Sequence, residues 1–84
     1  MAQVFTIRRK SDPLRLIAKF IVNESGDLPE PIKELIADRL GFTLSPDILF
    51  EPTGYGENPN LLPPPDFKLK DGREIWLYPG DTSQ

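Results

Sequence analysis

Polar and apolar residues alternate in two segments near the N-terminus. Val4–Ile7 is a short run of β-branched and aromatic residues, which favours a strand. In residues 14–22 every second position is apolar, and on a strand these positions share one face: Leu14, Leu16, Ala18, Phe20 and Val22. Arg15 and Lys19 lie opposite. A helix that buries Leu14, Ile17, Ala18 and Ile21 is the alternative. We expect a strand that closes a hairpin with Val4–Ile7.

Residues 31–40 carry apolar side chains at helical spacing. The positions that predict one buried stripe are Ile32, Leu35, Ile36 and Leu40. Asp27, Glu30 and Pro31 are typical of a helix start, and Gly41 suits a left-handed C-cap. The sequence therefore predicts a helix with a marked beginning and end.

The remaining segments predict short strands and a long connection. Ile48-Leu49-Phe50 indicates a strand bounded by Pro52, and residues 51–66 hold five prolines and two glycines, which predicts a long loop. Alternating residues 67–70 and 73–78 flank Asp71-Gly72, a pair typical of a hairpin with a type I′ turn. Residues 81–84 are expected to be a frayed polar tail.

These elements follow the order β-β-α-β-β-β, which predicts an α+β fold: a small mixed β-sheet with one helix packed across it. The N-terminal hairpin, the helix through Gly41, Ser45-Pro46-Asp47, Ile48-Leu49-Phe50 and Lys70-Asp71-Gly72-Arg73 together resemble ubiquitin-like β-grasp domains in their layout. The resemblance implies a scaffold for recognition. The proline-rich residues 51–66 and the ending Gly80–Gln84, which has no diglycine, depart from that family, so we do not expect conjugation chemistry.

Composition narrows the functions to be considered. The 84 residues include no histidine and no cysteine, which excludes Ser-His or Cys-His catalysis, a Cys/His zinc site and disulfides built from this chain alone. There is no phosphate-binding glycine motif and no calcium-loop motif. We therefore expect one non-catalytic domain spanning residues 1–84, with no cofactor and no metal. The absence of a signal-like or membrane-spanning apolar run predicts a cytoplasmic protein without membrane contact.

A protein partner is the leading expectation, and two regions are its candidate surfaces. The proline-rich loop offers an aromatic anchor, Tyr55, and a stiff extended segment: Leu61, Leu62, Pro63, Pro64 and Pro65. Trp76 and Tyr78 share a strand face and form an aromatic patch if the helix covers the opposite face. The alternative is that the loop only covers a small core and buries these rings. An open sheet edge is a further possibility for recognition.

Charge is distributed unevenly along the chain and predicts a second class of partner. The first 22 residues hold five basic side chains against Asp12, namely Arg8, Arg9, Lys10, Arg15 and Lys19. Residues 23–66 hold nine acidic and two basic side chains. The basic hairpin makes nucleic-acid binding the alternative function, although a net charge of −3 argues against it.

Overall fold

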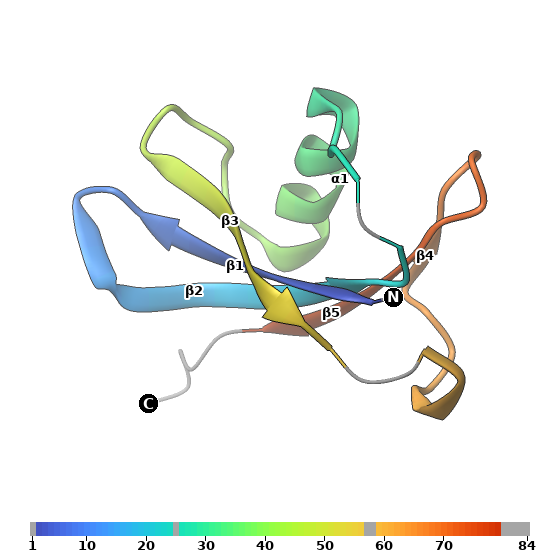
Figure 1. The fold of residues 1–84 in the computed structure, drawn as a ribbon. Coiled ribbons are helices and arrows are strands. Elements are labelled where there is room, and N and C mark those ends of the chain that lie inside the picture. Colours follow the sequence, from blue (N-terminus) through green and yellow to red (C-terminus); the bar gives the residue numbers. More distant parts are fainter. Residues whose placement is uncertain (1, 25, 57–58, 80–84) are drawn as a thin grey trace.

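The computed structural model describes residues 2–24, 26–56 and 59–79 (Figure 1). The elements run in the order β1 (Gln3–Arg9), β2 (Asp12–Val22), α1 (Glu30–Leu40), β3 (Ile48–Tyr55), the 3₁₀ turn η1 (Pro59–Leu61), β4 (Phe67–Lys68) and β5 (Glu74–Pro79). The predicted α+β class and the order of strands and helix are confirmed. The tail at residues 81–84 lies outside the described residues.

The five described strands form one sheet in the order β3-β1-β2-β5-β4. All four pairings are antiparallel, so the expectation of a mixed sheet is wrong. The long connection through α1 leads from β2 to β3, which pairs with β1 at the edge, and β5 returns to pair with β2. This order differs from the β-grasp order that the resemblance predicts, and the β-grasp arrangement is therefore not confirmed.

Residues 14–22 belong to a strand, and the helical alternative is wrong. Ala18, Phe20 and Val22 are buried on the face that meets α1, as the alternation predicts. Leu14 is the exception, because it is 94% exposed. Arg8 pairs with Leu16 and Arg9 with Asp12, so residues 13–15 bulge out without a partner in β1.

The helix α1 begins after Pro29 and ends at Gly41, whose φ of 88° is left-handed. The N–H groups of Gly41 and Phe42 both donate to the Ala37 carbonyl oxygen and satisfy the last turn. Its buried stripe is rotated from the predicted one: Ile36 and Ala37 are buried, whereas Leu35 is 42% exposed.

The strand β3 extends through Pro52 to Tyr55, so the predicted loop at residues 51–66 begins five residues too early. A proline is compatible with this position because β3 is an edge strand and needs hydrogen bonds on one side only. The register shifts between the pairs Val4–Gly54 and Phe5–Pro52, which places a bulge at Thr53.

The β4–β5 hairpin exists, but the predicted type I′ turn is wrong. That turn requires positive φ at both central residues, and among the described residues only glycines have positive φ. The Gly72 N–H donates to the Leu69 carbonyl, and the Leu69 N–H donates to the Arg73 carbonyl. These bonds define a three-residue loop that ends in Gly72, with φ 97°.

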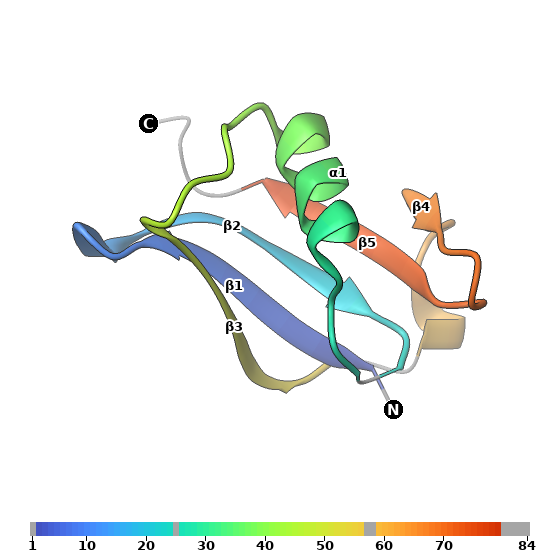
Figure 2. The same cartoon turned by 90° about the horizontal axis from the view of Figure 1, so that it is seen from above.

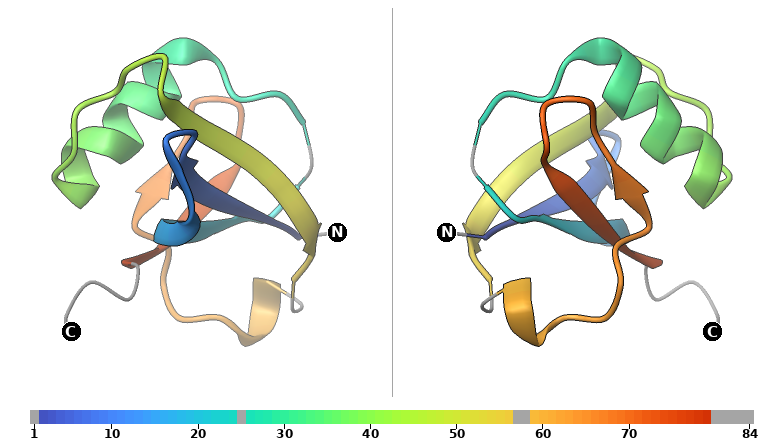
Figure 3. Two further views of the ribbon diagram at one scale, coloured as in Figure 1. Left: turned by 90° about the vertical axis from the view of Figure 1, so that its left-hand side faces the viewer. Right: turned by 90° about the vertical axis from the view of Figure 1, so that its right-hand side faces the viewer.

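The sheet has a different cover on each face. The helix α1 lies across one face (Figure 2), where the main core gathers around Phe20, Ile36 and Ile75. The segment containing η1 lies on the other side (Figure 3), next to a smaller core of Ala2, Ile21 and Trp76.

Candidate functional site

The proline-rich segment covers the second core. Trp76 is only 3% exposed, and its indole N–H donates to the Pro63 carbonyl oxygen. Leu62 packs against the same cluster, and a Cβ at Gly56 would lie 3.0 Å from Val4. The sequence leaves Trp76 and Tyr78 either as an exposed patch or buried under the loop, and the structure shows Trp76 buried beneath the proline-rich segment.

The other predicted partner-binding residues are dispersed. Tyr55 and Leu61 are 68% and 76% exposed. Pro63 and Pro64 are also exposed, while Pro65 is half-buried. Tyr78 is half-buried, and the Lys19 ammonium lies 5.7 Å from the centre of its ring. Tyr55, Leu61, Pro63 and Pro64 are thus the exposed members of this set.

A groove that the sequence did not reveal lies between α1 and β3. It consists of two hollows that share Lys33 and Phe50. One, of about 490 Å³, adds Glu30, Glu34, Leu44 and Ile48 to the lining, and the other, of about 460 Å³, adds Asp27, Leu28 and Pro52. We call these nine residues, with Lys33 and Phe50 at the junction, the α1–β3 groove.

The junction of the α1–β3 groove combines the Phe50 ring with the Lys33 ammonium, and the adjoining helix surface is acidic. The Phe50 ring packs edge-on against Phe20, with 5.9 Å between centroids. The Lys33 ammonium lies over the outer side of this region, 5.6 Å from the Phe50 centroid. Exposed Glu30 and Glu34 lie on the adjoining helix surface. The groove therefore offers apolar contact together with an excess of negative charge.

The β3 edge presents backbone groups beside this groove. The Lys10 N–H donates to the Asp47 carbonyl oxygen (2.7 Å), which makes Lys10 and Asp47 a hydrogen-bonded pair. Hydrogen-bonded and non-bonded pairs alternate in an antiparallel ladder, so the N–H and C=O of Phe50, which pairs with Ile7, point away from β1. Pro52 has no N–H, and the Ile48 N–H already donates to Ser45. Before the bulge, the open stretch is therefore short and centred on Phe50. Beyond the bulge, Tyr55 pairs with Gln3 next to the bonded pair Gly56–Ala2, so its N–H and C=O also point away from β1.

The opposite edge of the sheet, at β4, is less accessible to a further strand than the β3 edge. The Asp66 N–H donates to the Ile75 carbonyl (2.8 Å), and the Asp66 carboxylate accepts the Leu77 N–H (2.7 Å). The edge strand β4 has only two residues. Short edge strands and side-chain caps both hinder the addition of a further strand.

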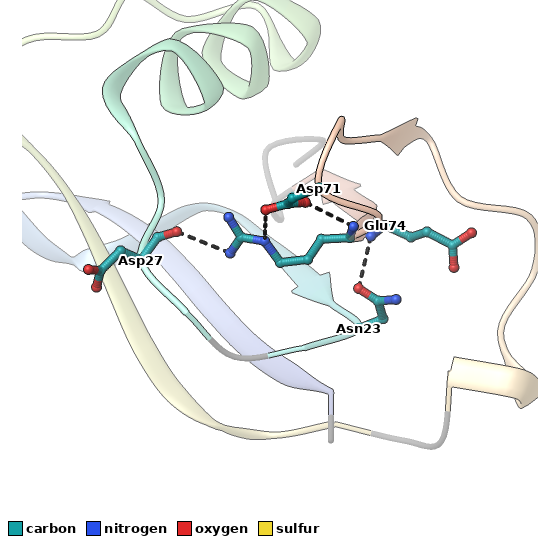
Figure 4. A network of polar contacts seen from close by, with 5 residues as sticks. Asn23, Asp27, Asp71 and Glu74 are labelled. Carbon is teal, nitrogen blue, oxygen red and sulfur yellow. Dashed lines mark hydrogen bonds and ion pairs between the residues drawn. The ribbon is translucent and has the colours of Figure 1, made fainter.

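A polar network holds the loop that forms one wall of the groove (Figure 4). The Arg73 side chain donates to the Asp71 carboxylate (2.9 Å) and to the Asp27 carbonyl oxygen (3.0 Å). The Glu74 N–H donates to the Asn23 side-chain oxygen. Hydrogen bonds from the Arg73 N–H and guanidinium lower the pKa of the Asp71 carboxyl. Arg73 thus ties the Asp27 backbone, just before α1, to the β4–β5 turn.

The basic residues of the N-terminal hairpin do not form one surface. Lys19 lies on the face that carries Tyr78. Arg9 and Arg15 line a hollow together with Ile17, a residue that packs against the main core on the α1 side. The Arg8 guanidinium donates to the Pro13 carbonyl oxygen. The cations are divided between the two faces of the hairpin.

Among the described residues, no cluster of three or more acidic side chains could hold a metal ion. No helix in the described part of the chain is long and apolar enough to cross a membrane.

Comparison of the chain with protein-family models, with curated proteins and with solved structures found no match. The resemblance to ubiquitin-like domains thus stays an expectation. Sequence analysis named an open sheet edge as a candidate without identifying it, and it missed Lys33 and Phe50. Neither residue carries a local signal, because their role depends on where α1 crosses the sheet.

Proposed function

We propose that this chain is a non-catalytic protein-interaction module that binds an extended segment of its partner along β3, in the α1–β3 groove. The observation that carries the proposal is the position of Phe50. Its backbone N–H and C=O point away from β1, and its ring lies where the two hollows meet. An added strand gains affinity from main-chain hydrogen bonds and specificity from side-chain pockets. The outward N–H and C=O of Phe50 can form such bonds, and the two hollows can serve as such pockets.

The groove also favours a particular kind of segment. Apolar side chains suit the hollows on either side of Phe50, and a Lys or Arg suits the rim at Glu30 and Glu34. Pro52 limits main-chain pairing to the stretch around Phe50. The expected ligand is therefore a short extended peptide of apolar residues with at least one basic residue.

The other two surfaces that the sequence suggested have less support. Trp76 is buried, and the Pro63 carbonyl is used to bind it. The proline-rich segment thus has a structural task, the covering of Trp76, that accounts for its position without a partner.

A random peptide library displayed on phage tests the proposal. We expect selected peptides to be apolar and basic, and to shift the amide NMR signals of residues 27–37 and 48–52. An added strand turns every second amide toward β3, so N-methylation of the peptide at successive positions should alternate between loss and retention of binding.

A matched pair of charge reversals tests the rim. Glu34→Lys should weaken the selected peptides at least about threefold, because rim charges steer and orient a charged ligand. Glu24→Lys, at an exposed position outside the groove, should leave affinity unchanged. Failure to select peptides, equal effects of the two variants, or shifts confined to Tyr55 and residues 59–65 would each reject the proposal.

A further inference from the structure

The tip of the β1–β2 hairpin has the composition expected of a ligand for the α1–β3 groove. We define the hairpin tip as residues 8–16. It contains the most exposed large apolar side chain among the described residues, Leu14, together with half-buried Leu16. Arg9, Lys10 and Arg15 are exposed. Leu14, Arg15 and Leu16 thus place one basic side chain between two apolar ones on a strand segment.

The backbone of this segment is also open to pairing. In the described residues, β5 pairs with β2 only from Ala18 to Val22. Residues 13–15 have no partner in β1 either, because they form the bulge between Asp12 and Leu16. Leu14 and Arg15 are therefore displayed on a strand segment that lacks neighbours on both sides among the described residues.

The tip cannot reach the groove of its own molecule. The Ser11 N–H and hydroxyl donate to the two carboxylate oxygens of Asp47 (2.9 and 2.8 Å), and the Lys10 N–H donates to the Asp47 carbonyl. These three bonds tie the tip to the loop that precedes β3. The hairpin turn projects from one end of the sheet, away from η1 and the β4–β5 turn (Figure 1). Its ligand site must be supplied by another molecule.

We infer that the hairpin tip of one copy docks in the α1–β3 groove of a second copy. This inference rests on the proposed function of the groove and names its occupant. Leu14 enters the apolar region beside Phe50, and Arg15 lies against the acidic rim at Glu30 and Glu34. The tip is already ordered by Asp47, which reduces the entropy lost on docking.

The two surfaces differ, so the contact is heterologous. After one contact forms, the pair still has one free tip and one free groove, and association continues into rings or open chains. The attraction between Arg15 and the acidic rim weakens as ionic strength rises. Concentration-dependent, salt-sensitive self-association is the direct consequence.

Sedimentation velocity of the full chain over a range of concentrations tests this inference. We expect the weight-average sedimentation coefficient of the unaltered chain to rise with concentration at low salt. Arg15→Glu and Glu34→Lys should each lower the association constant about tenfold or more, because each places like charges in contact. Lys70→Glu and Glu24→Lys make the same charge changes at exposed positions elsewhere and should have no such effect.

Mixing the two impaired variants gives the decisive result. In the mixture the unaltered Arg15 of one variant can meet the unaltered Glu34 of the other, and the two substituted side chains also carry opposite charges. The mixture should therefore associate at concentrations where each variant alone does not. A symmetric tip-to-tip contact would instead let Glu34→Lys associate alone. That result, or no complex in the mixture, would overturn the inference.

The outcome also separates this inference from the proposed function. If the unaltered chain stays monomeric at every concentration while selected peptides still bind the groove, self-docking is wrong and the proposed function stands. If neither self-association nor peptide binding occurs, both are wrong.

Discussion

Replacement of Leu62 by alanine tests whether the proline-rich segment is part of the folded core. Leu62 packs against a cluster in which Ala2 and Trp76 are 1% and 3% exposed. Truncation of a fully buried leucine costs about 2–5 kcal/mol, and Leu62 is only half-buried, so we expect a loss of about 1–2 kcal/mol. In a chain of this size, that loss lowers the melting temperature by about 5–15 °C.

The neighbouring residue provides the control. Leu61 is 76% exposed, so the same truncation there should change the free energy of unfolding by less than about 0.5 kcal/mol. Urea unfolding followed by fluorescence measures both variants, because Trp76 is the single tryptophan of the chain and lies under the segment. Leu62→Ala should also shift native emission to longer wavelength. Equal destabilisation by both variants would show that the segment is not a cover.

Two further predictions concern the stability of the fold at low pH and the effect of replacing Gly72. Hydrogen bonds from Ser11 lower the pKa of Asp47, and those from Arg73 lower the pKa of Asp71, below 3.8. A carboxyl whose pKa is lower in the folded state stabilises that state at any pH above its unfolded-state pKa. This stabilisation is lost as the pH falls through the folded-state pKa. Urea midpoints should therefore decline below about pH 4, and the decline should be smaller in Asp71→Asn; an unchanged pH profile in that variant would contradict this cause. Gly72→Ala, at φ 97°, should lower stability by about 1–2 kcal/mol in thermal melts followed by circular dichroism, and a neutral result would refute the assigned turn.

The sequence predicts the helix and strands best where several local signals agree. The helix start at residues 30–31 and its end at Gly41 carry capping signals that act within one turn, and both were placed correctly. The strand at residues 14–22 was chosen over a helix because its charged residues fell opposite its apolar ones. The prediction that Leu14 shares the buried face is wrong, because a bulge exposes Leu14 and local alternation does not predict a bulge.

The sequence-based predictions are wrong where contacts with distant segments determine the local structure. Pro52 predicted the end of a strand, but a strand at the sheet edge tolerates a missing N–H. Asp71-Gly72 predicted a type I′ turn, but the Asp71 carboxylate binds the N–H and guanidinium of Arg73 and is found with a different turn. The antiparallel order likewise follows from pairings between distant segments, which local periodicity does not encode.

Contacts between distant segments also make β3, and not the proline-rich segment, the candidate site. That segment binds Trp76 through Pro63, and Asp66 at its end caps β5, so it closes one face and one edge of the sheet. The edge strand β3 keeps an outward N–H at Phe50, beside the α1–β3 groove. Substitutions in the proline-rich segment should therefore affect stability, and substitutions in the α1–β3 groove should affect peptide binding. Leu62→Ala should lose stability and keep its affinity for groove peptides, whereas Glu34→Lys should keep its stability and lose affinity. If Leu62→Ala abolished peptide binding while the fold remained intact, the segment would be the binding surface and the groove would not.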